Sequence, residues 1–469
     1  MKKGILSLIT ILLVSILSAQ DYNYQFRLSL KDKGKTSYTT DKPQDFLSEK
    51  AIERRKKHNI AINRTDLPIS DDYLRTIEET GGKVIAKSKW LNTVTVHCTD
   101  STMVNLFSAL PFVYDTQFVW RGKPDSIHNN KTDTVAIYPI KENIDLDNYY
   151  GKAFDNIRLN NGQALHNAGF KGDGIDIAVI DAGFNNLPKI EMLDNIHIKG
   201  QKGFVYQKED LFGSSANAHG LMVLSCIAAN KPNQLVGTAP EANFWILSSE
   251  DTRSEFPVEE DYWVAAVEYA DSIGVDVINT SLGYAEFDKP AQSYTKAELN
   301  GRSNFITRGA NAAANKGLLI VCSAGNSGDS PWRSITSPAD APNILTVGAI
   351  QQDSIISPFS SRGLTADGRI KPDVVALGSL SAVVNNKGLV SQNYGTSFSS
   401  PIMCGMAACL WQAFPTLTNK EIINVIRQSA NRYDFPDADY GYGIPDMGKA
   451  MEIAQKVLEK KALSKDKNK

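Results

Sequence analysis

The chain has 469 residues, of which 42% are hydrophobic, and this is enough for a large buried core divided over two or three domains. Its 50 Lys and Arg residues against 52 Asp and Glu residues leave a formal net charge of -2. A chain so close to neutral has no overall electrostatic attraction for nucleic acid or for an anionic membrane surface, so neither partner is expected.

The first 20 residues have the pattern of a secretory signal peptide. A short basic start, Met1–Lys3, precedes an apolar run from Ile5 to Leu17, and Ser18-Ala19 offers small residues for cleavage. The run is short for a transmembrane helix, and no other stretch is long and apolar enough to cross a bilayer. We therefore expect export to the periplasm or out of the cell, with no membrane span after removal of the signal.

The cysteines form no recognisable disulfide or metal-binding framework. Four of the five lie in apolar segments, where a free cysteine behaves as a small hydrophobic residue, and no Cys-x-x-Cys spacing with partnering histidines occurs. A pair among these four stays an open alternative in an oxidising compartment. The five are Cys98 and the core residues Cys226, Cys322, Cys404 and Cys409.

Residues 21–120 predict a small α+β domain. Residues 59–69 and 121–147 are interpreted as loop or linker, and the second is rich in Asp, Asn and Lys with two prolines. On its residues alone, the small domain is an independent binding module. Its expected strands are Gln25–Leu30, Leu91–Val96 and a short one near Phe112, and its expected helices are Leu47–His58 and Thr102–Leu110.

Residues 148–455 alternate between buried strands and amphipathic helices. This alternation predicts an α/β fold: a mostly parallel sheet between helices on both faces, joined by right-handed crossovers. Thr418–Glu421 is a capping box for a helix to about Ser429, and the Lys-rich residues 456–469 predict a fraying helix and a solvated tail. Other expected helices are 160–168, 261–273 and 305–315, and expected strands are 175–180, 242–247, 275–279, 318–323, 344–347 and 371–376.

Two titratable residues, Asp181 and His219, are expected at the ends of secondary-structure elements. Asp181 follows the apolar strand 175–180 and precedes Ala182-Gly183, a place where open α/β sheets put ligands and catalysis, but where Asp also commonly caps a turn. His219 opens a short apolar helix, and the other five histidines lack this setting. A lone histidine is more often structural, yet at a helix mouth it is a candidate general base.

Two further polar residues sit next to glycines. In Ser323-Ala324-Gly325-Asn326 the asparagine follows a buried strand, which fits a left-handed turn or an amide donor for an oxyanion. Ser397 stands where the turn Asn393–Thr396 runs into an apolar helix, so unpaired backbone N–H groups lie close to its hydroxyl. On this local pattern alone, Ser397 is more often a helix cap than a nucleophile.

The segment Gly395-Thr396-Ser397-Phe398-Ser399-Ser400-Pro401 closely resembles the nucleophile motif of the subtilisin-like serine proteases, usually written Gly-Thr-Ser-Met-Ala-Xaa-Pro. Asp181-Ala182-Gly183, His219-Gly220 and the segment ending at Asn326 resemble the other motifs of that family, in its order. Each motif alone is weak to moderate, but four in order are specific, and the order Asp, His, Ser differs from that of chymotrypsin-like enzymes and α/β-hydrolases. The resemblance covers residues 148 to about 454.

The resemblance implies a subtilisin-like three-layer fold and a serine endopeptidase. In it Ser397 would be the nucleophile, His219 the base and Asp181 its partner, with the Asn326 amide in the oxyanion hole. It also implies that protein or peptide substrates bind as an added strand. The residues that would line the substrate cleft are Ser281, Leu282, Gly283, Ala324 and Gly325.

The resemblance changes the interpretation of residues 21–120. Because they lie between a signal peptide and a catalytic region, they are expected to be a propeptide that assists folding and acts as an intramolecular inhibitor, cut from the enzyme in the linker 121–147. Members of the family often bind structural calcium, but no Asp-rich loop with clear ligand spacing occurs here, so no metal or other cofactor is assigned and calcium stays an open alternative.

The motif flanks depart from the family pattern. His219-Gly220-Leu221 replaces the usual His-Gly-Thr, and Asp-Ala-Gly replaces Asp-Ser-Gly or Asp-Thr-Gly. A non-catalytic binding protein with this fold is therefore one alternative. A second is an esterase or peptide ligase that uses the same three residues.

Overall fold

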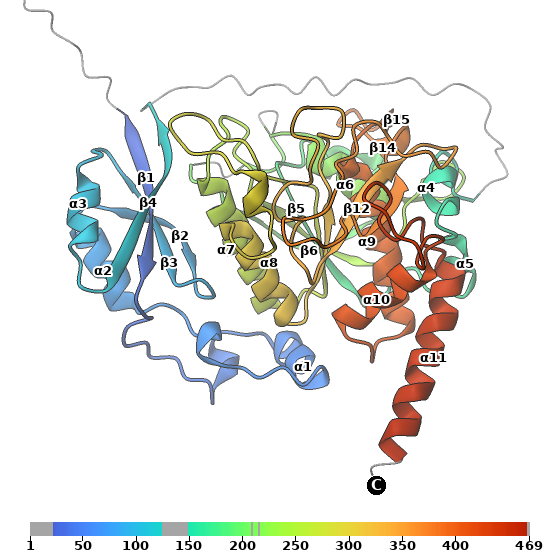
Figure 1. Cartoon of the computed structure of the whole chain (residues 1–469), viewed down its shortest axis with the longest axis horizontal. Helices are drawn as coiled ribbons and strands as arrows, with labels where there is room; N and C mark the ends of the chain where they lie inside the picture. Colours follow the sequence, from blue (N-terminus) through green and yellow to red (C-terminus); the bar gives the residue numbers. More distant parts are fainter. Residues whose placement is uncertain (1–21, 124–148, 208–209, 214–215, 467–469) are drawn as a thin grey trace, which may run out of the picture.

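A computed structural model describes residues 22–123, 149–207, 210–213 and 216–466. The expected signal peptide and most of the expected linker lie outside these residues. The described chain forms an N-terminal domain (residues 22–123) packed against a large domain (residues 149–466) (Figure 1). In the described residues no helix is long and apolar enough to cross a membrane.

The N-terminal domain is an antiparallel sheet with two helices on one face. The strand order is β2-β3-β1-β4. Its core gathers alternate strand residues such as Leu28, Val94 and Val96 against Ile77 and Phe107 of the helices. The elements are β1 (Asn23–Leu30), α1 (Glu49–Lys57), α2 (Asp71–Glu79), β2 (Lys83–Ser88), β3 (Thr93–Cys98), α3 (Met103–Ser108) and β4 (Val113–Gly122), with short 3-10 turns at Pro43–Asp45 and Arg64–Asp66.

The large domain is built on a parallel sheet of seven strands in the order β13-β12-β11-β10-β5-β9-β6. Helices α6 and α9 cover one face, and α7 and α8 cover the other, as the alternation in the sequence predicts (Figure 1). The sheet strands are β5 (Asp176–Asp181), β6 (His197–Gly203), β9 (Asn243–Ser248), β10 (Val277–Thr280), β11 (Leu319–Ser323), β12 (Leu345–Ile350) and β13 (Val374–Leu377).

The remaining elements of the large domain are helices and two small antiparallel ribbons. Helix α11 at the C-terminus extends away from the body of the domain (Figure 1). The helices are α4 (Phe154–Arg158), α5 (Gln163–Asn167), α6 (His219–Ala228), α7 (Val258–Ile273), α8 (Phe305–Asn315), α9 (Thr396–Ala413), α10 (Asn419–Ser429) and α11 (Met447–Asp466), the 3-10 turns are Leu187–Lys189, Glu191–Leu193 and Lys296–Glu298, and the ribbons pair β7 (Asn230–Lys231) with β8 (Leu235–Val236) and β14 (Ser381–Val384) with β15 (Val390–Asn393).

Several sequence expectations differ from this structure. The helix expected at 160–168 is found as the shorter helix α5, Gln163–Asn167, and Asn161, in a left-handed conformation (φ 52°), separates it from the unexpected helix α4, Phe154–Arg158. The expected linker begins too early, since Arg121 and Gly122 still pair with β1 in strand β4. Helix α2 and strand β2 were not anticipated.

All five cysteines are buried free thiols. Burial raises the pKa of Cys98 to about 11 and that of Cys322 to about 12, so these side chains behave as apolar core groups at neutral pH.

The two domains meet through buried charged groups along helix α7. The Arg27 guanidinium on β1 donates to both Asp261 carboxylate oxygens, at 2.7 and 2.5 Å. Glu268 on α7 accepts from the Ser88 hydroxyl and from the backbone N–H groups of Lys89 and Trp90, at 2.5 to 3.0 Å. These bonds hold the β2–β3 turn against α7.

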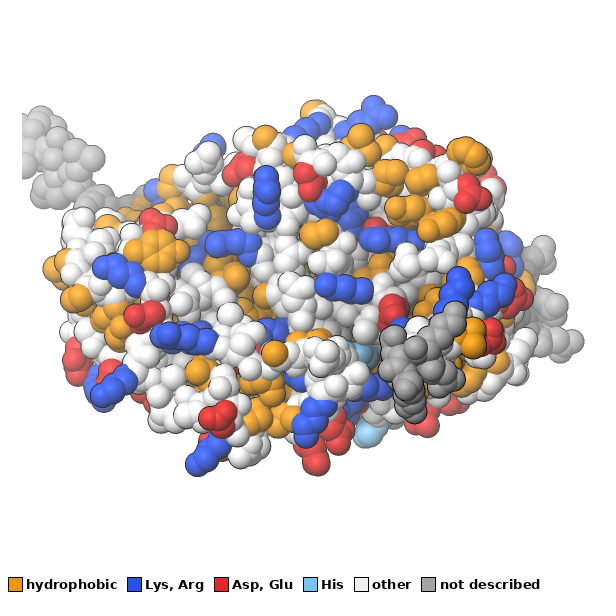
Figure 2. Space-filling model, turned by 60° about the horizontal axis from the view of Figure 1, so that its bottom comes forward, with side chains coloured by type: hydrophobic (Ala, Val, Ile, Leu, Met, Phe, Trp, Pro, Cys, Tyr) orange, Lys and Arg blue, Asp and Glu red, His pale blue; other side chains and the backbone are white. Residues whose placement is uncertain are grey.

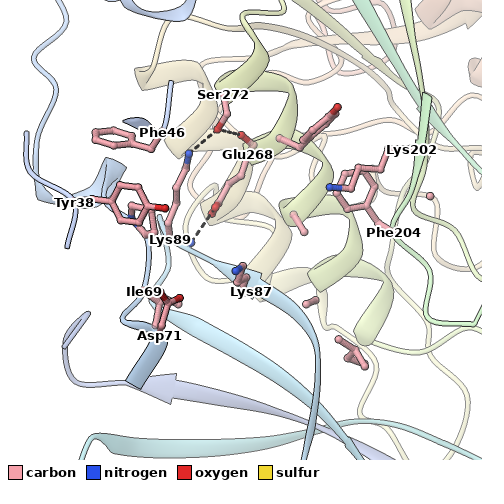
Figure 3. A pocket seen from close by; sticks show the side chains of 16 residues that line it. Tyr38, Phe46, Ile69, Asp71, Lys87, Lys89, Lys202, Phe204, Glu268 and Ser272 are labelled. Carbon is pink, nitrogen blue, oxygen red and sulfur yellow. Dashed lines mark hydrogen bonds between the residues drawn. The ribbon is translucent and has the colours of Figure 1, made fainter. Parts of the chain in front are cut away.

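A pocket of about 490 Å³ opens beside this contact (Figure 3). Tyr38, Phe46 and Lys89 of the N-terminal domain face Glu268 and Ser272 of α7 across it, and the Lys89 ammonium donates to the Ser272 hydroxyl at 2.7 Å. On the face of the molecule in Figure 2, Lys and Arg side chains are interspersed with Asp and Glu rather than gathered in one patch.

A second attachment lies at the C-terminal end of α7, where helix α1 packs against the large domain. Arg54 and Arg55 both bond the Asp271 carboxylate, at 2.6 and 2.9 Å. Arg55 also contacts Asp66 at 3.1 Å, and Lys316 of the large domain contacts Asp66 at 2.7 Å. These groups are buried, so each charge depends on its partners for the solvation that water no longer provides. We call this group of residues the α1 clamp.

The buried carboxylate of the α1 clamp allows a test of its contribution to stability. Asp271→Asn removes the carboxylate that Arg54 and Arg55 share, so that Arg54 loses its ion-pair partner and Arg55 keeps only Asp66, and we expect the free energy of unfolding of the intact chain to fall by about 3–5 kcal/mol. Urea unfolding would measure it. Asp72→Asn, which removes an exposed ion pair with Arg75, is the matched control and should change stability little. Equal effects of both substitutions would contradict the importance of the clamp.

His58, at the end of α1, should make this packing sensitive to acid. Its ring lies 6.0 Å from the ring of Trp411, and burial, together with Lys57 and Arg54, lowers its pKa from 6.5 to about 4, against the attraction of Glu421. The folded state therefore disfavours the charged ring, and the stabilisation present above pH 6.5 is lost as the pH falls toward 4. In thermal unfolding of the intact chain, the midpoint should fall less over this range for His58→Gln than for the wild type; parallel pH profiles would contradict this.

Candidate active site

The predicted site residues come together at the carboxyl edge of the parallel sheet. Asp181 ends β5, Ser281 follows β10, Asn326 follows β11, and helices α6 and α9 begin at this edge. They surround one cleft of about 320 Å³. The residues that line the cleft are Ala182, Asn217, His219, Glu250, Thr252, Ser281, Leu282, Gly283, Ser323, Gly325, Asn326, Ser327, Thr336, Thr396 and Ser397.

Asp181 and His219 form a hydrogen-bonded pair. The Asp181 Oδ1 atom lies 2.7 Å from His219 Nδ1 and accepts the Ala182 N–H at 2.8 Å. The carboxylate is fully buried, whereas the imidazole is about one-quarter exposed. With Nδ1–H donated to the carboxylate, the Nε2 atom of the ring is left as the basic nitrogen.

The start of α6 places His219 over the end of β5. The Asn217 side chain accepts the backbone N–H of His219 at 2.7 Å. Gly220 allows the close approach, because a Cβ atom there would lie 2.9 Å from Asp181 Cβ and 2.7 Å from the Gly183 carbonyl oxygen. The glycine of the His-Gly motif thus has a steric role.

Ser397 is the second residue of α9 and is held by the segment after β10. Its hydroxyl donates to the Ser281 carbonyl at 3.4 Å, and the Ser281 hydroxyl donates to the Ser397 carbonyl at 2.9 Å. One turn later, Ser400 donates to the Asn279 side chain at 2.9 Å. The ring of Phe398 lies 5.9 Å from the ring of His219, so the start of α9 is next to the imidazole.

Asn326 is oriented by the turn before α9. Its Oδ1 atom accepts both the Thr396 N–H at 2.8 Å and the Thr396 hydroxyl at 2.9 Å. With the carbonyl end of the amide engaged, Nδ2 is the donor that the side chain offers at the cleft. The Gly395 backbone has a φ of 143°, a conformation that favours glycine at this turn.

The residues expected along the cleft are placed there with one exception. Ser281, Leu282, Gly283 and Gly325 line it. Ala324 does not line it, because its side chain is fully buried in the core and its N–H and carbonyl bond Val347 and Thr336. The alternation along an extended backbone turns Ala324 inward while its neighbours face the cleft.

Glu250, Thr252 and Thr336 also line the cleft and were not anticipated from the sequence. Glu250 follows β9, the neighbour of β5, so the only sequence signal was its place after a strand. Thr336 belongs to an irregular segment with no motif of its own.

Three glutamates gather near this end of the sheet. Ligand oxygens of Glu250, Glu255 and Glu259 lie within 4.8 Å of one another, in a grouping of a kind that can hold a cation. Glu259 is fully buried and already accepts the N–H groups of Asp251 and Phe256, both at 3.1 Å. Burial and the charges of Glu250 and Glu255 raise the pKa of Glu259 well above its usual range. The raised pKa favours proton uptake by Glu259, which lowers the repulsion among the three carboxylates, and calcium at this grouping stays an open alternative.

Comparison with family models gives two matches. Residues 172–443 match the model described as the subtilase family, Peptidase S8. Residues 25–134 match the model described as the Peptidase S8 propeptide domain of Bacteroidota, of which residues 124–134 lie outside the described structure.

Curated relatives match the large domain. M-protease of Shouchella clausii is 29% identical over 272 residues, which are 57% of this chain and 62% of that protein. Subtilisin BL of Lederbergia lenta is 29% identical over 286 residues, covering 60% of this chain and 92% of that protein. Serine protease AprX of Bacillus subtilis is 27% identical over 315 residues, covering 61% and 66%.

A solved structure shares the fold of nearly the whole chain. The epidermin leader peptide processing serine protease (EpiP) of Staphylococcus aureus superposes with a TM-score of 0.63 at 17% identity, covering 92% of this chain and 98% of that one. At this identity the likeness concerns the fold alone.

Proposed function

The chain belongs to the subtilase family of serine peptidases, and from this premise we propose that it is an exported serine endopeptidase made as an autoprocessed zymogen. The observation that carries the proposal is that His219, hydrogen-bonded to the buried Asp181, lines the same cleft as Ser397 and Asn326. The cleft thus brings together a candidate nucleophile, a candidate base with a buried partner, and an amide donor.

In the proposed reaction, Ser397 Oγ attacks the peptide carbonyl carbon while His219 Nε2 takes the hydroxyl proton. His219 then gives this proton to the leaving amine, and an acyl-enzyme on Ser397 remains. Water, deprotonated by the same imidazole, attacks the ester and releases the acid. Asp181 keeps the ring in the tautomer that has Nε2 unprotonated and stabilises the charged ring between the two proton transfers.

The negative oxygen of each tetrahedral intermediate would bind the Asn326 side-chain amide and the Ser397 backbone N–H. Thr396 supports this role because it fixes the carbonyl end of the Asn326 amide. The Ser397 N–H is among the first donors of α9, which have no partner inside the helix. Both donors are therefore prepared before substrate arrives.

A substrate in extended conformation would bind alongside Ser281–Gly283, the segment that follows β10 into the cleft. Binding of this kind would let the substrate chain continue on both sides of the scissile bond, as endopeptidase activity requires.

The N-terminal domain fits the role of a propeptide that inhibits the enzyme. Strand β4 reaches the large domain near the cleft, where Trp120 Nε1 donates to the Ser254 hydroxyl at 3.3 Å and Phe118 packs edge-on against Phe256. From there residues 124–148 connect to the large domain, and we expect the processing cut among residues 121–147. The signal-like residues 1–20 support export, and the choice between periplasm and medium stays open.

The role of Ser397 in processing can be tested by mass spectrometry of the chain expressed without residues 1–20. Wild type should lose its N-terminal domain by a cut within residues 121–147, and Ser397→Ala should stay intact because it lacks the nucleophile. A fluorophosphonate probe should label the wild type alone. Processing of both proteins at the same rate and position would contradict self-cleavage, and absent labelling of wild type would favour a non-catalytic binding protein.

The oxyanion donor can be tested with Asn326→Asp, which retains Oδ1 for Thr396 but replaces the donor by an acceptor. We expect kcat for peptide hydrolysis to fall by about 10²–10³-fold with little change in KM, the size of effect known for such a donor in subtilisin, a member of this family. Asn315→Ala, at an exposed asparagine remote from the cleft, is the control. An unchanged kcat would remove Asn326 from the mechanism.

A further inference from the structure

Thr336 lies between the two glycine-bearing walls of the cleft. One wall is the segment after β10 with Gly283, and the other is the segment after β11 with Gly325. A Cβ atom on Gly283 would lie 2.1 Å from Thr336 Oγ1, and one on Gly325 would lie 3.1 Å from Oγ1 and 3.3 Å from Cγ2. The side chain of Thr336 therefore fills the space between the walls and forms the floor of the cleft there.

Backbone bonds hold Thr336 in this place. Its N–H donates to the Ala324 carbonyl at 3.3 Å, which ties it to the second wall. The next residue, Ser337, exchanges two hydrogen bonds with Tyr284, at 2.8 and 3.0 Å, which tie it to the first. A β-branched side chain also has few rotamers, so Thr336 cannot swing aside without breaking these contacts.

The hydroxyl of Thr336 has no evident structural use. Its Oγ1 atom is buried and has no hydrogen-bond partner among the described residues, and the residue as a whole is 8% exposed. Such an unpaired hydroxyl normally costs stability. What the residue contributes here is its shape, which is the shape of valine.

We propose that Thr336 restricts the residue before the scissile bond to small side chains, those of glycine, alanine and serine. This inference rests on the proposed function. A substrate strand alongside Ser281–Gly283, with its carbonyl oxygen at Asn326, would direct that side chain between the two walls. The side chain of a leucine or phenylalanine at this substrate position would clash with Oγ1 and Cγ2 of Thr336 before it could enter the space between the walls fully.

The test compares kcat/KM of the processed protein for peptide p-nitroanilides that differ only in this residue, with alanine, leucine or phenylalanine before the cleaved bond. Wild type should prefer alanine. Thr336→Ala removes the two atoms that contact the walls and should raise the leucine-to-alanine ratio at least about tenfold, since a methylene in such a pocket is worth about 10–200-fold.

Thr336→Val separates shape from hydrogen bonding, because it keeps the volume and loses the hydroxyl. It should retain the wild-type ratio. Two results would overturn this inference and leave the proposed function standing. One is a wild type that cleaves best after phenylalanine, and the other is an active Thr336→Ala variant with the wild-type leucine-to-alanine ratio of kcat/KM. Failure of wild type to hydrolyse any of the peptides would overturn the proposed function, and the inference with it.

Discussion

The attachment of the start of helix α9 to the strand ends is the constraint on which the site depends. Helix α9 is buried along nearly its whole length, so its position is set by the core. Three side-chain contacts then fix its first turn: Asn326 with Thr396, Ser281 with Ser397, and Asn279 with Ser400. Each joins the helix to a segment at the carboxyl end of β10 or β11. The cleft geometry therefore follows from the register of the sheet, and a shift of one strand would displace the Ser397 hydroxyl and the Asn326 amide together.

The interface between the domains is chemically unlike the core. Beside an apolar contact of Ala86, Trp90 and Val119 with the large domain, it contains ion pairs and carboxylates bonded to backbone N–H groups, whereas the interiors of both domains are apolar. Buried ion pairs add little net stability compared with apolar packing, but they tolerate no mismatched partner. The arrangement thus favours specificity of domain association over high affinity. This suits an N-terminal domain that is proposed to dissociate from the enzyme after cleavage.

Local motifs predicted the candidate site residues, whereas the remaining features of the site and the domain interface depend on long-range packing. The family motifs placed Asp181, His219, Asn326 and Ser397 correctly at one edge of the sheet, because parallel strands bring their carboxyl ends together. The family and the α/β fold are confirmed.

Ala324 was wrong as a lining residue, since its inward direction depends on the pleat after β11. Thr336 could not be found, because its position comes from its own bond to Ala324 and from the backbone pairing of its neighbour Ser337 with Tyr284, both distant in the chain. The α1 clamp was missed for a similar reason: Arg54 and Arg55 look like an exposed basic helix until the large domain supplies Asp271.

The α1 clamp also has a consequence for how the two domains part. While residues 124–148 join the two domains in one chain, their association is intramolecular and does not depend on the protein concentration. A single cut in this segment makes the same contacts bimolecular. From then on, dilution alone would lower the fraction of large domain that is covered, because the bound fraction of a cut pair depends on the protein concentration.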